Sequence, residues 1–381
     1  MIDKKRLADV FQALVRIDSV SKNEKKVCDF IAEILHSMGA DVQVDDAGKK
    51  VGGNCGNLIA HFPGDSGLEP LFLSAHMDTV SPGEGIDPVL EEGVFSSTGD
   101  TILGADDKSA IAIIIEALRV LQSSGGLMCP VDVVITVCEE IGLLGAKHLD
   151  VGRFSARAGY VLDASDIEGI VTKAPAANRF SFVVRGKDAH AGAHPEDGVN
   201  AIAAAAKALA RLEPGRVDED TTFNIGVIEG GMATNIVPAE VTVRGEARSH
   251  SDERLQEVTD HIVSVFEETV AAQAVRSTHP GLPAVETSVE NDFCSLLIPH
   301  DHPVVRRAVS AAACLGFRLE EKVSGGGSDA NILFQKGITA GILGTGMKDM
   351  HTVRETVALD DMAKAATLLV GIVEEWSSRG E

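Results

Sequence analysis

The first part of the chain alternates helical patterns with short, mostly apolar runs. In the helical segments apolar residues recur every three to four positions, whereas the runs between them are rich in Val, Ile and Leu. Such runs separated by helices are typical of a mostly parallel sheet that is covered on both faces. The pattern predicts helices over residues 4–16, 25–38 and 108–122, and strands over residues 41–45, 57–62, 71–75, 131–137 and 160–162.

The pattern changes near Lys173. Phe180, Phe182 and Val184 alternate with polar residues, and the same period of two returns over residues 241–248. This period predicts antiparallel strands with one face exposed to solvent. Helical patterns accompany these strands, so we expect a smaller α+β domain inserted into the first. These helices are predicted over residues 199–212 and 252–272.

A doubly wound pattern resumes near His302. It predicts helices over residues 303–315 and 331–335, a strand over residues 338–343 and a closing helix from Leu359. The expected fold class is therefore α/β, with a mostly parallel, doubly wound sheet and an inserted α+β domain. The expected boundaries are residues 1–174 and 298–381 for the two parts of the larger domain, and residues 175–297 for the insertion.

The charge of the chain narrows the classes of function. Its 381 residues carry a formal net charge of −23. Nucleic acids and anionic membranes select basic surfaces, so we expect neither as a partner. The six cysteines form no Cys-x-x-Cys pair, and the first residues do not have the pattern of a signal peptide. We therefore expect a cytoplasmic protein with reduced thiols.

Side chains that can bind metals follow the predicted strands. His76 and Asp78 come directly after the strand over residues 71–75, and Glu139 and Glu140 follow the strand over residues 131–137. In open α/β sheets, ligands bind outside the carboxyl ends of the strands, so we expect these groups in one crevice. The further candidates are Asp163, which follows residues 160–162, Asp106 and Asp107, which precede the helix at Lys108, and His351.

So many neighbouring carboxylates require something that neutralises their negative charge. They would repel one another at neutral pH, and bound cations would remove that conflict. Imidazole and carboxylate ligands suit zinc, with cobalt or manganese as substitutes. Each motif alone also fits an ordinary structure: a loop edge for His76, a solvated turn for Glu139 and Glu140, and a helix N-terminus for Asp106. Their joint occurrence at separate strand ends favours a site for two metal ions.

Four motifs in a fixed order carry a family resemblance. HMDTVSPGEG, TILGADDKSAIA, EEIGLLGAK and HTVRE resemble segments of the di-zinc exopeptidase and amidohydrolase family, which includes tripeptidase T, glutamate carboxypeptidase, aminoacylase and succinyl-diaminopimelate desuccinylase. The resemblance is greatest to the peptidase T-like branch and covers nearly the whole chain. It implies a zinc-peptidase fold in which the inserted domain serves as a lid and as a dimerisation domain.

The resemblance also implies a set of metal ligands. His76 and Asp163 would bind one zinc ion, and Glu140 and His351 would bind the other. Asp106 would bridge the two ions, and the peptide bond after it is typically cis in this family.

Three further residues would assist the reaction, as the resemblance implies. Asp78 would orient the ring of His76. Glu139 would be the general base on a water molecule shared by the metals. His190, in the AHAGAHPEDGVNA segment of the inserted domain, would polarise the scissile carbonyl, either of its own subunit or of a partner subunit.

The substrate contacts are the last residues that the resemblance implies. Asn235 and Arg248 match positions that contact the substrate, and Ser328 and Asp329 lie in a turn that would face it. Two departures from the family pattern occur. Gly325 stands where tripeptidase T has an arginine, so the resemblance does not extend to strict tripeptide selection. Glu246 precedes Ala247 and Arg248 where many relatives have Asp-x-Arg.

The resulting hypothesis is a zinc-dependent hydrolase that cleaves the amide bond of short peptides. It would be an aminopeptidase or tripeptidase-like exopeptidase, would use Glu139 as the general base and would form a homodimer through the inserted domain. One alternative is an amidohydrolase that deacylates N-acyl amino acids. A second is a non-catalytic binding protein of the same fold, which would not need Glu139 beside a full ligand set.

Overall fold

The computed structural model describes residues 1–125 and 129–378, and the chain divides into two compact units. Unit 1 comprises Met1–Lys173, Leu297–Ser324 and Ser328–Glu381. Unit 2 comprises Ala174–Leu296 and Gly325–Gly327. Each unit has its own hydrophobic core among the described residues.

The helices of unit 1 bury one apolar face each. In α1 the side chain of Asp3 accepts the N–H of Arg6 in the first turn, and Leu7, Phe11 and Leu14 are buried. Gly39 follows α2 with a φ of +87°, a conformation that favours glycine and ends the helix. The helices are α1 (Lys4–Val15), α2 (Lys25–Ser37), α3 (Ala47–Val51), α4 (Ala105–Ser123), α5 (Leu144–His148), α8 (Pro303–Cys314), α9 (Asp329–Gln335) and α10 (Leu359–Ser377), with a 3₁₀ helix at Val151–Arg153.

Within the described residues, nine strands form the central sheet of unit 1. β3 pairs in parallel with β6 and β7, and β16 pairs in parallel with β7, whereas β1 and β2 are antiparallel to their neighbours. The predicted mostly parallel α/β class is confirmed. The strands, in their order across the sheet, are β1 (Asp41–Val44), β2 (Leu58–Phe62), β6 (Val131–Thr136), β3 (Leu71–His76), β7 (Ala158–Ala164), β16 (Thr339–Gly344), β8 (Gly169–Ala174) and β14 (Leu296–Leu297), with β15 (Glu320–Val323) beside β8.

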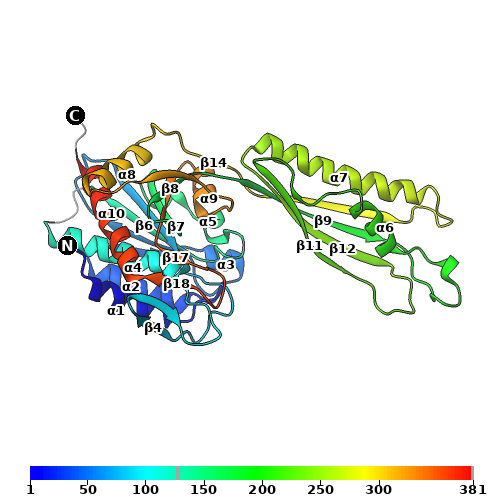
Figure 1. Cartoon of the computed structure of the whole chain (residues 1–381), viewed down its shortest axis with the longest axis horizontal. Coiled ribbons are helices and arrows are strands. Elements are labelled where there is room, and N and C mark those ends of the chain that lie inside the picture. The colour runs from blue at the N-terminus through cyan, green and yellow to red at the C-terminus, as the bar shows by residue number, and fades with distance from the viewer. Residues whose placement is uncertain (126–128, 379–381) are drawn as a thin grey trace. The chain divides into compact units, whose positions relative to one another are not determined.

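Both faces of the central sheet are covered. Every residue of β3 and of β6 is buried, although successive side chains point to opposite faces. Leu71 and Leu73 belong to the main core with α4 and α10, which pack side by side (Figure 1). Phe72 points to the opposite face of the sheet, where its ring centroid lies 5.6 Å from that of Phe154. Strands buried on both faces explain the continuous apolar runs of the sequence.

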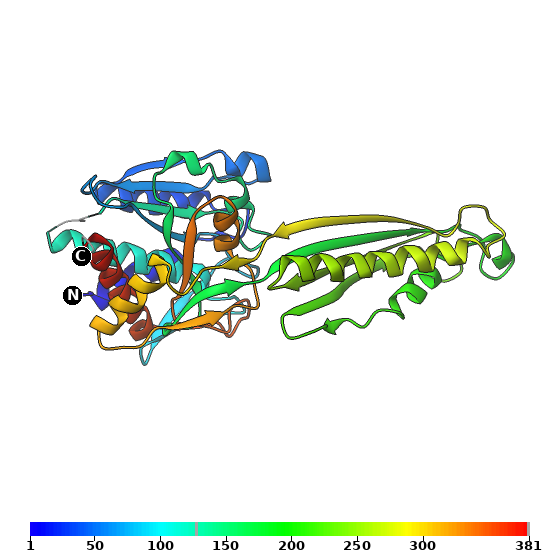
Figure 2. The same cartoon turned by 90° about the horizontal axis from the view of Figure 1, so that it is seen from above.

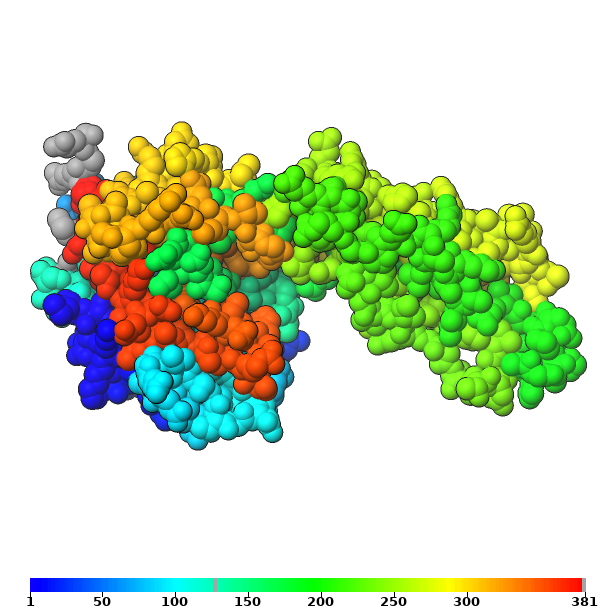
Figure 3. Space-filling model, viewed as in Figure 1, coloured from blue at the N-terminus to red at the C-terminus, as the bar shows by residue number. Residues whose placement is uncertain are grey.

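A smaller sheet joins distant parts of unit 1, and the sequence pattern did not predict it. Its order is β17-β18-β5-β4, and Val357 pairs with Phe95 at its centre. Figure 3 shows the surface of the β4–β5 hairpin, in cyan, against the red segment that contains β18. The sheet therefore brings the residues before Asp106 next to the residues after His351. Its strands are β4 (Pro88–Glu91), β5 (Val94–Ser97), β17 (Met347–Lys348) and β18 (Thr356–Ala358).

Unit 2 is an antiparallel sheet with helices on one face. Phe180, Phe182 and Val184 alternate inward as predicted, and Phe182 stacks on Phe266 of α7 with ring centroids 3.9 Å apart. Figure 2 shows α7 running along the sheet. The elements are β9 (Ala176–Arg185), β10 (Gly215–Arg216), β11 (Thr221–Gly230), β12 (Glu240–Ser249), β13 (Ala284–Phe293), α6 (Ala201–Leu209), α7 (Asp252–Ala274) and a 3₁₀ helix at Pro195–Asp197. Among the described residues of both units, no helix combines the length and the apolar character needed to cross a bilayer.

Candidate metal centre

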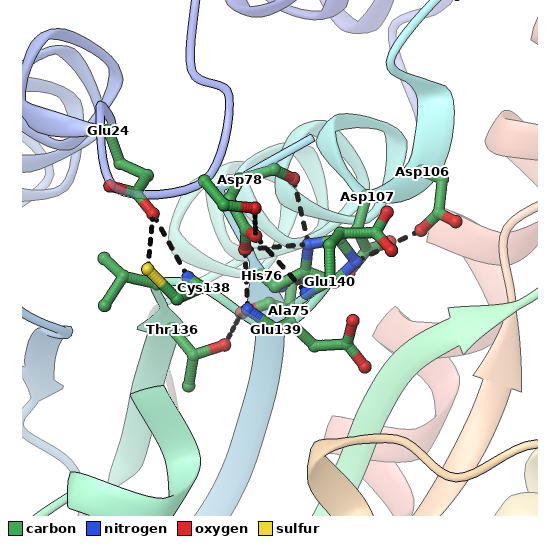
Figure 4. Close-up of polar contacts among 12 residues, drawn as sticks. Glu24, Ala75, His76, Asp78, Asp106, Asp107, Thr136, Cys138, Glu139 and Glu140 are labelled. Carbon is green, nitrogen blue, oxygen red and sulfur yellow. Dashed lines mark hydrogen bonds and ion pairs between the residues drawn. The ribbon is translucent and has the colours of Figure 1, made fainter. Parts of the chain in front are cut away.

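Three neighbouring strands of unit 1 deliver the predicted side chains to one edge of the sheet. His76 is the last residue of β3, Asp163 lies near the end of β7, and Glu139 and Glu140 follow the end of β6. Because β3 is parallel to both neighbours, these ends lie along the same edge. Figure 4 shows His76, Glu139 and Glu140 there, together with Asp106 from the start of α4.

The carboxylate of Asp106 lies between two imidazoles. Its Oδ1 is 3.1 Å from Nε2 of His76, and its Oδ2 is 3.2 Å from Nε2 of His351. Nε2 of His351 is also 3.1 Å from Oε1 of Glu140. One ligand-type atom each from His76, Asp106 and Glu140 lies within 4.8 Å of the others. The carboxylate of Asp106 is thus the member of the cluster that links the two imidazoles.

A second group of ligand atoms surrounds the same imidazole. His76, Asp107 and Asp163 each place one such atom within 4.8 Å of the others. The peptide bond between Asp106 and Asp107 is cis, as the family resemblance implies, and the two neighbouring carboxylates contribute to different groups. Oδ2 of Asp107 accepts the backbone N–H of His76 at 3.1 Å, and its Oδ1 has no hydrogen-bond partner among the described residues.

Burial and neighbouring charges change the proton affinity of several members of this cluster. Burial alone would lower the pKa of His76, but the carboxylates of Asp106 and Asp78 raise it well above its ordinary value. Hydrogen bonds to Asp106 and Glu140 raise the pKa of His351 to about 10. Burial and the nearby carboxylate of Asp106 raise the pKa of Asp163. The cluster thus attracts positive charge, and its imidazole and carboxylate donors fit divalent metal ions such as zinc.

Asp78 contacts two parts of the cluster. Nδ1 of His76 is 3.0 Å from the backbone oxygen of Asp78 and 3.4 Å from its carboxylate. The same carboxylate accepts the backbone N–H groups of Glu139 at 2.9 Å and of Glu140 at 3.3 Å. Burial and the carboxylate of Asp163 raise the pKa of Glu139, so this side chain holds a proton more strongly than an ordinary glutamate. Asp78 therefore holds the backbone of both glutamates as well as the imidazole ring.

The predicted residues of the inserted domain all lie in unit 2. His190 is exposed, and its Nδ1 accepts the backbone N–H groups of Gly192 and Ala193 at 3.2 and 3.1 Å. The ring proton of neutral His190 is therefore on Nε2, which remains available as a donor. Asn235 lies beside it, since its backbone oxygen accepts the N–H of Ala191 at 2.9 Å.

Arg248 lies elsewhere in unit 2, on β12. Its Nε is 3.0 Å from Oε1 of Glu246, and its Nη2 donates to Oε2 of Glu246 at 3.2 Å. Arg248 and Arg216 line a cavity of about 290 Å³. The Glu246 of the Glu-Ala-Arg departure is thus an intramolecular partner of the arginine.

Ser328 and Asp329 have structural partners in unit 1. The hydroxyl of Ser328 accepts the N–H of Ala330 and so caps α9, which begins two residues before the predicted start. Asp329 is buried, and its Oδ2 accepts the hydroxyl hydrogen of Thr136 at 2.5 Å. Its Oδ1 has no hydrogen-bond partner among the described residues. A substrate contact by either residue remains a prediction.

Sequence reasoning missed Glu355, which holds the backbone ahead of Asp106. Its buried carboxylate accepts the N–H groups of Leu103 at 2.8 Å, of Gly104 at 2.7 Å and of Asp106 at 2.9 Å. The available signal was an acidic residue four positions after His351 in the HTVRE motif.

Comparison with known proteins identifies the family. The model of Peptidase family M20/M25/M40 matches residues 72–375, most of the chain. The chain belongs to this family. Aminopeptidase PepT from Bacillus cereus ATCC 10987 is 38% identical, with a TM-score of 0.89 over 99% of this chain and 100% of that one. A tripeptidase from Staphylococcus aureus subsp. aureus mu50 is 37% identical, with a TM-score of 0.91 over 99% of each chain. "Uncharacterized protein YqjE" of Bacillus subtilis strain 168 is 38% identical over 376 residues, 98% of this chain and 99% of its own.

Membership of the M20/M25/M40 family confirms the predicted peptidase T-like resemblance and the enzyme class. The family is metal-dependent, and the group formed by His76, Asp106 and Glu140 is a possible metal-binding cluster of this chain. The similarity to two solved peptidases over nearly the full length supports a peptidase rather than a binding protein.

Proposed function

We propose that the protein is a cytoplasmic zinc exopeptidase that releases N-terminal residues from short peptides, in the manner of an aminopeptidase or tripeptidase. The observation that carries this proposal is the carboxylate of Asp106 between the imidazoles of His76 and His351, beside Glu140. The similarity to the Bacillus cereus aminopeptidase and the Staphylococcus aureus tripeptidase favours peptides as substrates.

The metal site that we propose holds two zinc ions, with cobalt or manganese as substitutes. His76 and Asp163 would hold one ion, Glu140 and His351 would hold the other, and Asp106 would be shared between them. When bound, the two ions supply Lewis-acid activation of a water molecule and of the amide carbonyl. The three carboxylates among these five ligands would offset part of the positive charge of the two ions.

The remaining chemistry belongs to side chains of the chain. Glu139 accepts a proton from the attacking water and delivers it to the leaving nitrogen. The peptide N–H groups of Glu139 and Glu140 are held by Asp78, which keeps the base and its neighbouring ligand in fixed positions. The Nε2–H group of His190 donates a hydrogen bond to the developing oxyanion, an interaction worth about 10²–10³ in rate for a typical donor.

In this proposal the insertion predicted over residues 175–297, which corresponds to unit 2 (Ala174–Leu296 with Gly325–Gly327), serves as the lid and dimerisation domain. Its surface exposes the apolar side chains of Ile228 and Met232, at 55% and 90%. A homodimer through this unit is the arrangement that we propose, with His190 acting on the site of the other subunit. Isologous dimers are the commonest closed assemblies of soluble proteins.

Substrate contacts are assigned to both units. Arg248 and Asn235 of unit 2 bind the terminal carboxylate and backbone of the peptide, and Ser328 and Asp329 face the substrate from the start of α9. Arg248 is half-exposed beside a cavity of about 290 Å³, so a peptide carboxylate can replace its present partner Glu246.

The experiment that tests the function compares substrates with and without metal. Protein loaded with zinc, cobalt or manganese is incubated with tripeptides, dipeptides and N-acetyl amino acids, with a chelator-treated sample as the control. We expect release of the N-terminal residue from short peptides and no turnover after chelation. Preferential hydrolysis of N-acetyl amino acids would instead support the alternative deacylase, and activity that survives metal removal would contradict both.

A further inference from the structure

Three consecutive backbone N–H groups at the end of β6 donate to carboxylates. The N–H of Cys138 donates to Oε1 of Glu24 at 3.1 Å, and the N–H groups of Glu139 and Glu140 donate to the two oxygens of Asp78. Figure 4 shows these contacts on either side of the turn. Cys138 has a φ of +53°, which is uncommon for a residue with a side chain, so the turn depends on its partners to hold this shape.

Glu24 is an unusual partner because it comes from a distant loop and is fully buried. Its exposed fraction is 0%, and it lies 114 positions from Cys138. Oε1 also accepts the N–H of Lys22 at 2.9 Å and the thiol hydrogen of Cys138 at 3.2 Å, whereas Oε2 has no hydrogen-bond partner among the described residues. Burial of a carboxylate with one unpaired oxygen is costly, so a purely structural explanation of Glu24 needs a local benefit.

Helix capping does not provide that benefit. Glu24 occupies the N-cap position of α2, where a side chain normally accepts an N–H group of the first turn. The carboxylate of Glu24 makes no such bond, and it points instead at the peptide and thiol of Cys138. Its contacts therefore serve the turn that carries Glu139 and Glu140 rather than its own helix.

The same loop also contacts the segment that follows His76. The hydroxyl of Ser21 donates to Oδ2 of Asp78 at 2.7 Å. Backbone bonds run from the N–H of Thr79 to Ser19 at 3.0 Å and from the N–H of Ser21 to Thr79 at 3.3 Å. Residues 19–24 thus touch both of the turns that bring candidate metal ligands to the edge of the sheet.

We propose that Glu24 is a positioning residue of the metal centre: by accepting the N–H and S–H of Cys138 it sets the turn that aims Glu139 and Glu140, and with Ser21 it fixes this turn relative to the segment after His76. The expected effect on kcat rests on the proposed function, whereas the expected effects on zinc affinity and on the cobalt spectrum concern only the positions of the metal ligands. Residues of this kind typically change metal affinity or activity by about 10- to 100-fold when they are replaced.

The test compares Glu24→Ala, Glu24→Gln and a control on the same helix, Glu33→Gln, whose side chain is exposed. Gln retains an acceptor oxygen for the N–H of Cys138, whereas Ala leaves this N–H without one. The measurements are the affinity of chelator-stripped protein for zinc, by competition with a chromophoric chelator, the absorption spectrum of the cobalt form, and kcat and KM for a tripeptide.

We expect Glu24→Ala to bind zinc about 10- to 100-fold more weakly, to alter the cobalt spectrum and to lower kcat with little change in KM. Glu24→Gln should restore most of the affinity and the spectrum, and Glu33→Gln should match the wild type. A Glu24→Ala protein that melts earlier but keeps wild-type affinity, spectrum and kcat would overturn the proposal, because only a structural role would then remain.

Two further controls keep the result decisive. If Glu24→Ala does not fold, Ser21→Ala removes the second contact of the loop, and its zinc affinity must fall in the same direction; an unchanged affinity overturns the proposal. If the wild-type protein cleaves no peptide, the proposed function fails, whereas the zinc affinity and cobalt spectrum of the variants still decide whether Glu24 positions the ligands.

Discussion

Glu355 accepts the backbone N–H of Asp106 at 2.9 Å, although the two residues are 249 positions apart in the chain. The same carboxylate holds the N–H groups of Leu103 and Gly104. Because His351 lies four positions before Glu355, one short segment both contributes an imidazole to the cluster and fixes the backbone that presents the central carboxylate. The position of Asp106 is therefore coupled to that of His351.

Replacement of Glu355 by Gln should weaken this coupling. The amide replaces one acceptor oxygen of the carboxylate by an N–H₂ donor, so at least one of the three backbone N–H groups loses its acceptor. We therefore expect zinc affinity to fall about 10-fold or more and the free energy of unfolding to fall by about 1–3 kcal/mol. Chelator competition and urea denaturation measure the two effects. Glu374→Gln, on the exposed side of α10, is the matched control. Equal zinc affinity in both variants would show that Glu355 does not support Asp106.

Variants of the neighbouring Glu139 and Glu140 should distinguish the general base from the metal ligand. We expect Glu139→Gln to keep its bound metal and to lose about 10²–10⁴ in kcat, because Gln cannot accept the proton. Glu140→Gln should lose metal, because its carboxylate lies 3.1 Å from His351 and within the cluster of His76 and Asp106. Elemental analysis and peptide turnover distinguish the two. More than a tenth of wild-type turnover in Glu139→Gln would remove this residue from the base role.

His190 allows a test of where the lid acts. A His190→Ala protein and a Glu139→Gln protein should each be nearly inactive. If His190 serves the site of the other subunit, a dimer of one subunit of each variant contains one site with both Glu139 and an intact His190. Subunit exchange between the two variants should therefore restore, in each mixed dimer, up to about half of the activity of a wild-type dimer. Absence of recovery in demonstrated mixed dimers would place His190 on its own subunit's site.

Arg6 and Lys5 give a stability test that leaves the metal centre intact. Arg6 pairs with the buried carboxylate of Glu116 on α4 through Nε at 2.6 Å and Nη2 at 2.7 Å. Arg6→Ala removes the cationic partner of this carboxylate, which keeps the backbone N–H of Asp3 at 2.8 Å, so we expect a loss of about 2 kcal/mol. The loss is less than for a fully buried pair because Arg6 is 38% exposed. Lys5→Ala removes only an exposed pair with Asp9 and should have no measurable effect. Urea denaturation measures the stability of both variants. Equal unfolding midpoints for Arg6→Ala and Lys5→Ala would contradict the expectation.

Much of the architecture is predictable because burial leaves a periodic pattern. The fully buried strands β3 and β6 appear as apolar runs, and the half-buried β9 appears as an alternation. Strand ends then indicate where His76 and Glu140 gather. The small sheet of β4, β5, β17 and β18 was missed because its short strands have no sustained period and pair residues far apart, such as Phe95 with Val357.

The residues that support the candidate site left weaker signals. Glu24 and Glu355 bind backbone N–H groups, and such bonds depend on tertiary proximity rather than on any spacing in the sequence. Asp106 and Asp107 are adjacent and chemically identical, and only the geometry at the start of α4 directs one carboxylate between the imidazoles and the other to the N–H of His76. Patterns identify candidate ligands, whereas three-dimensional contacts identify what holds them.

The long separation between Asp106 and Glu355 also has a consequence for biosynthesis. At about 5–20 residues per second, the ribosome needs roughly 12–50 s to add the 249 residues between them. Throughout that interval the N–H groups ahead of Asp106 lack their acceptor and β5 lacks its neighbour β18, while the whole of Ala174–Leu296 is synthesised. A nascent chain therefore cannot assemble the cluster of Asp106, Glu140 and His351, or the backbone support from Glu355, until residues 351–355 have left the exit tunnel.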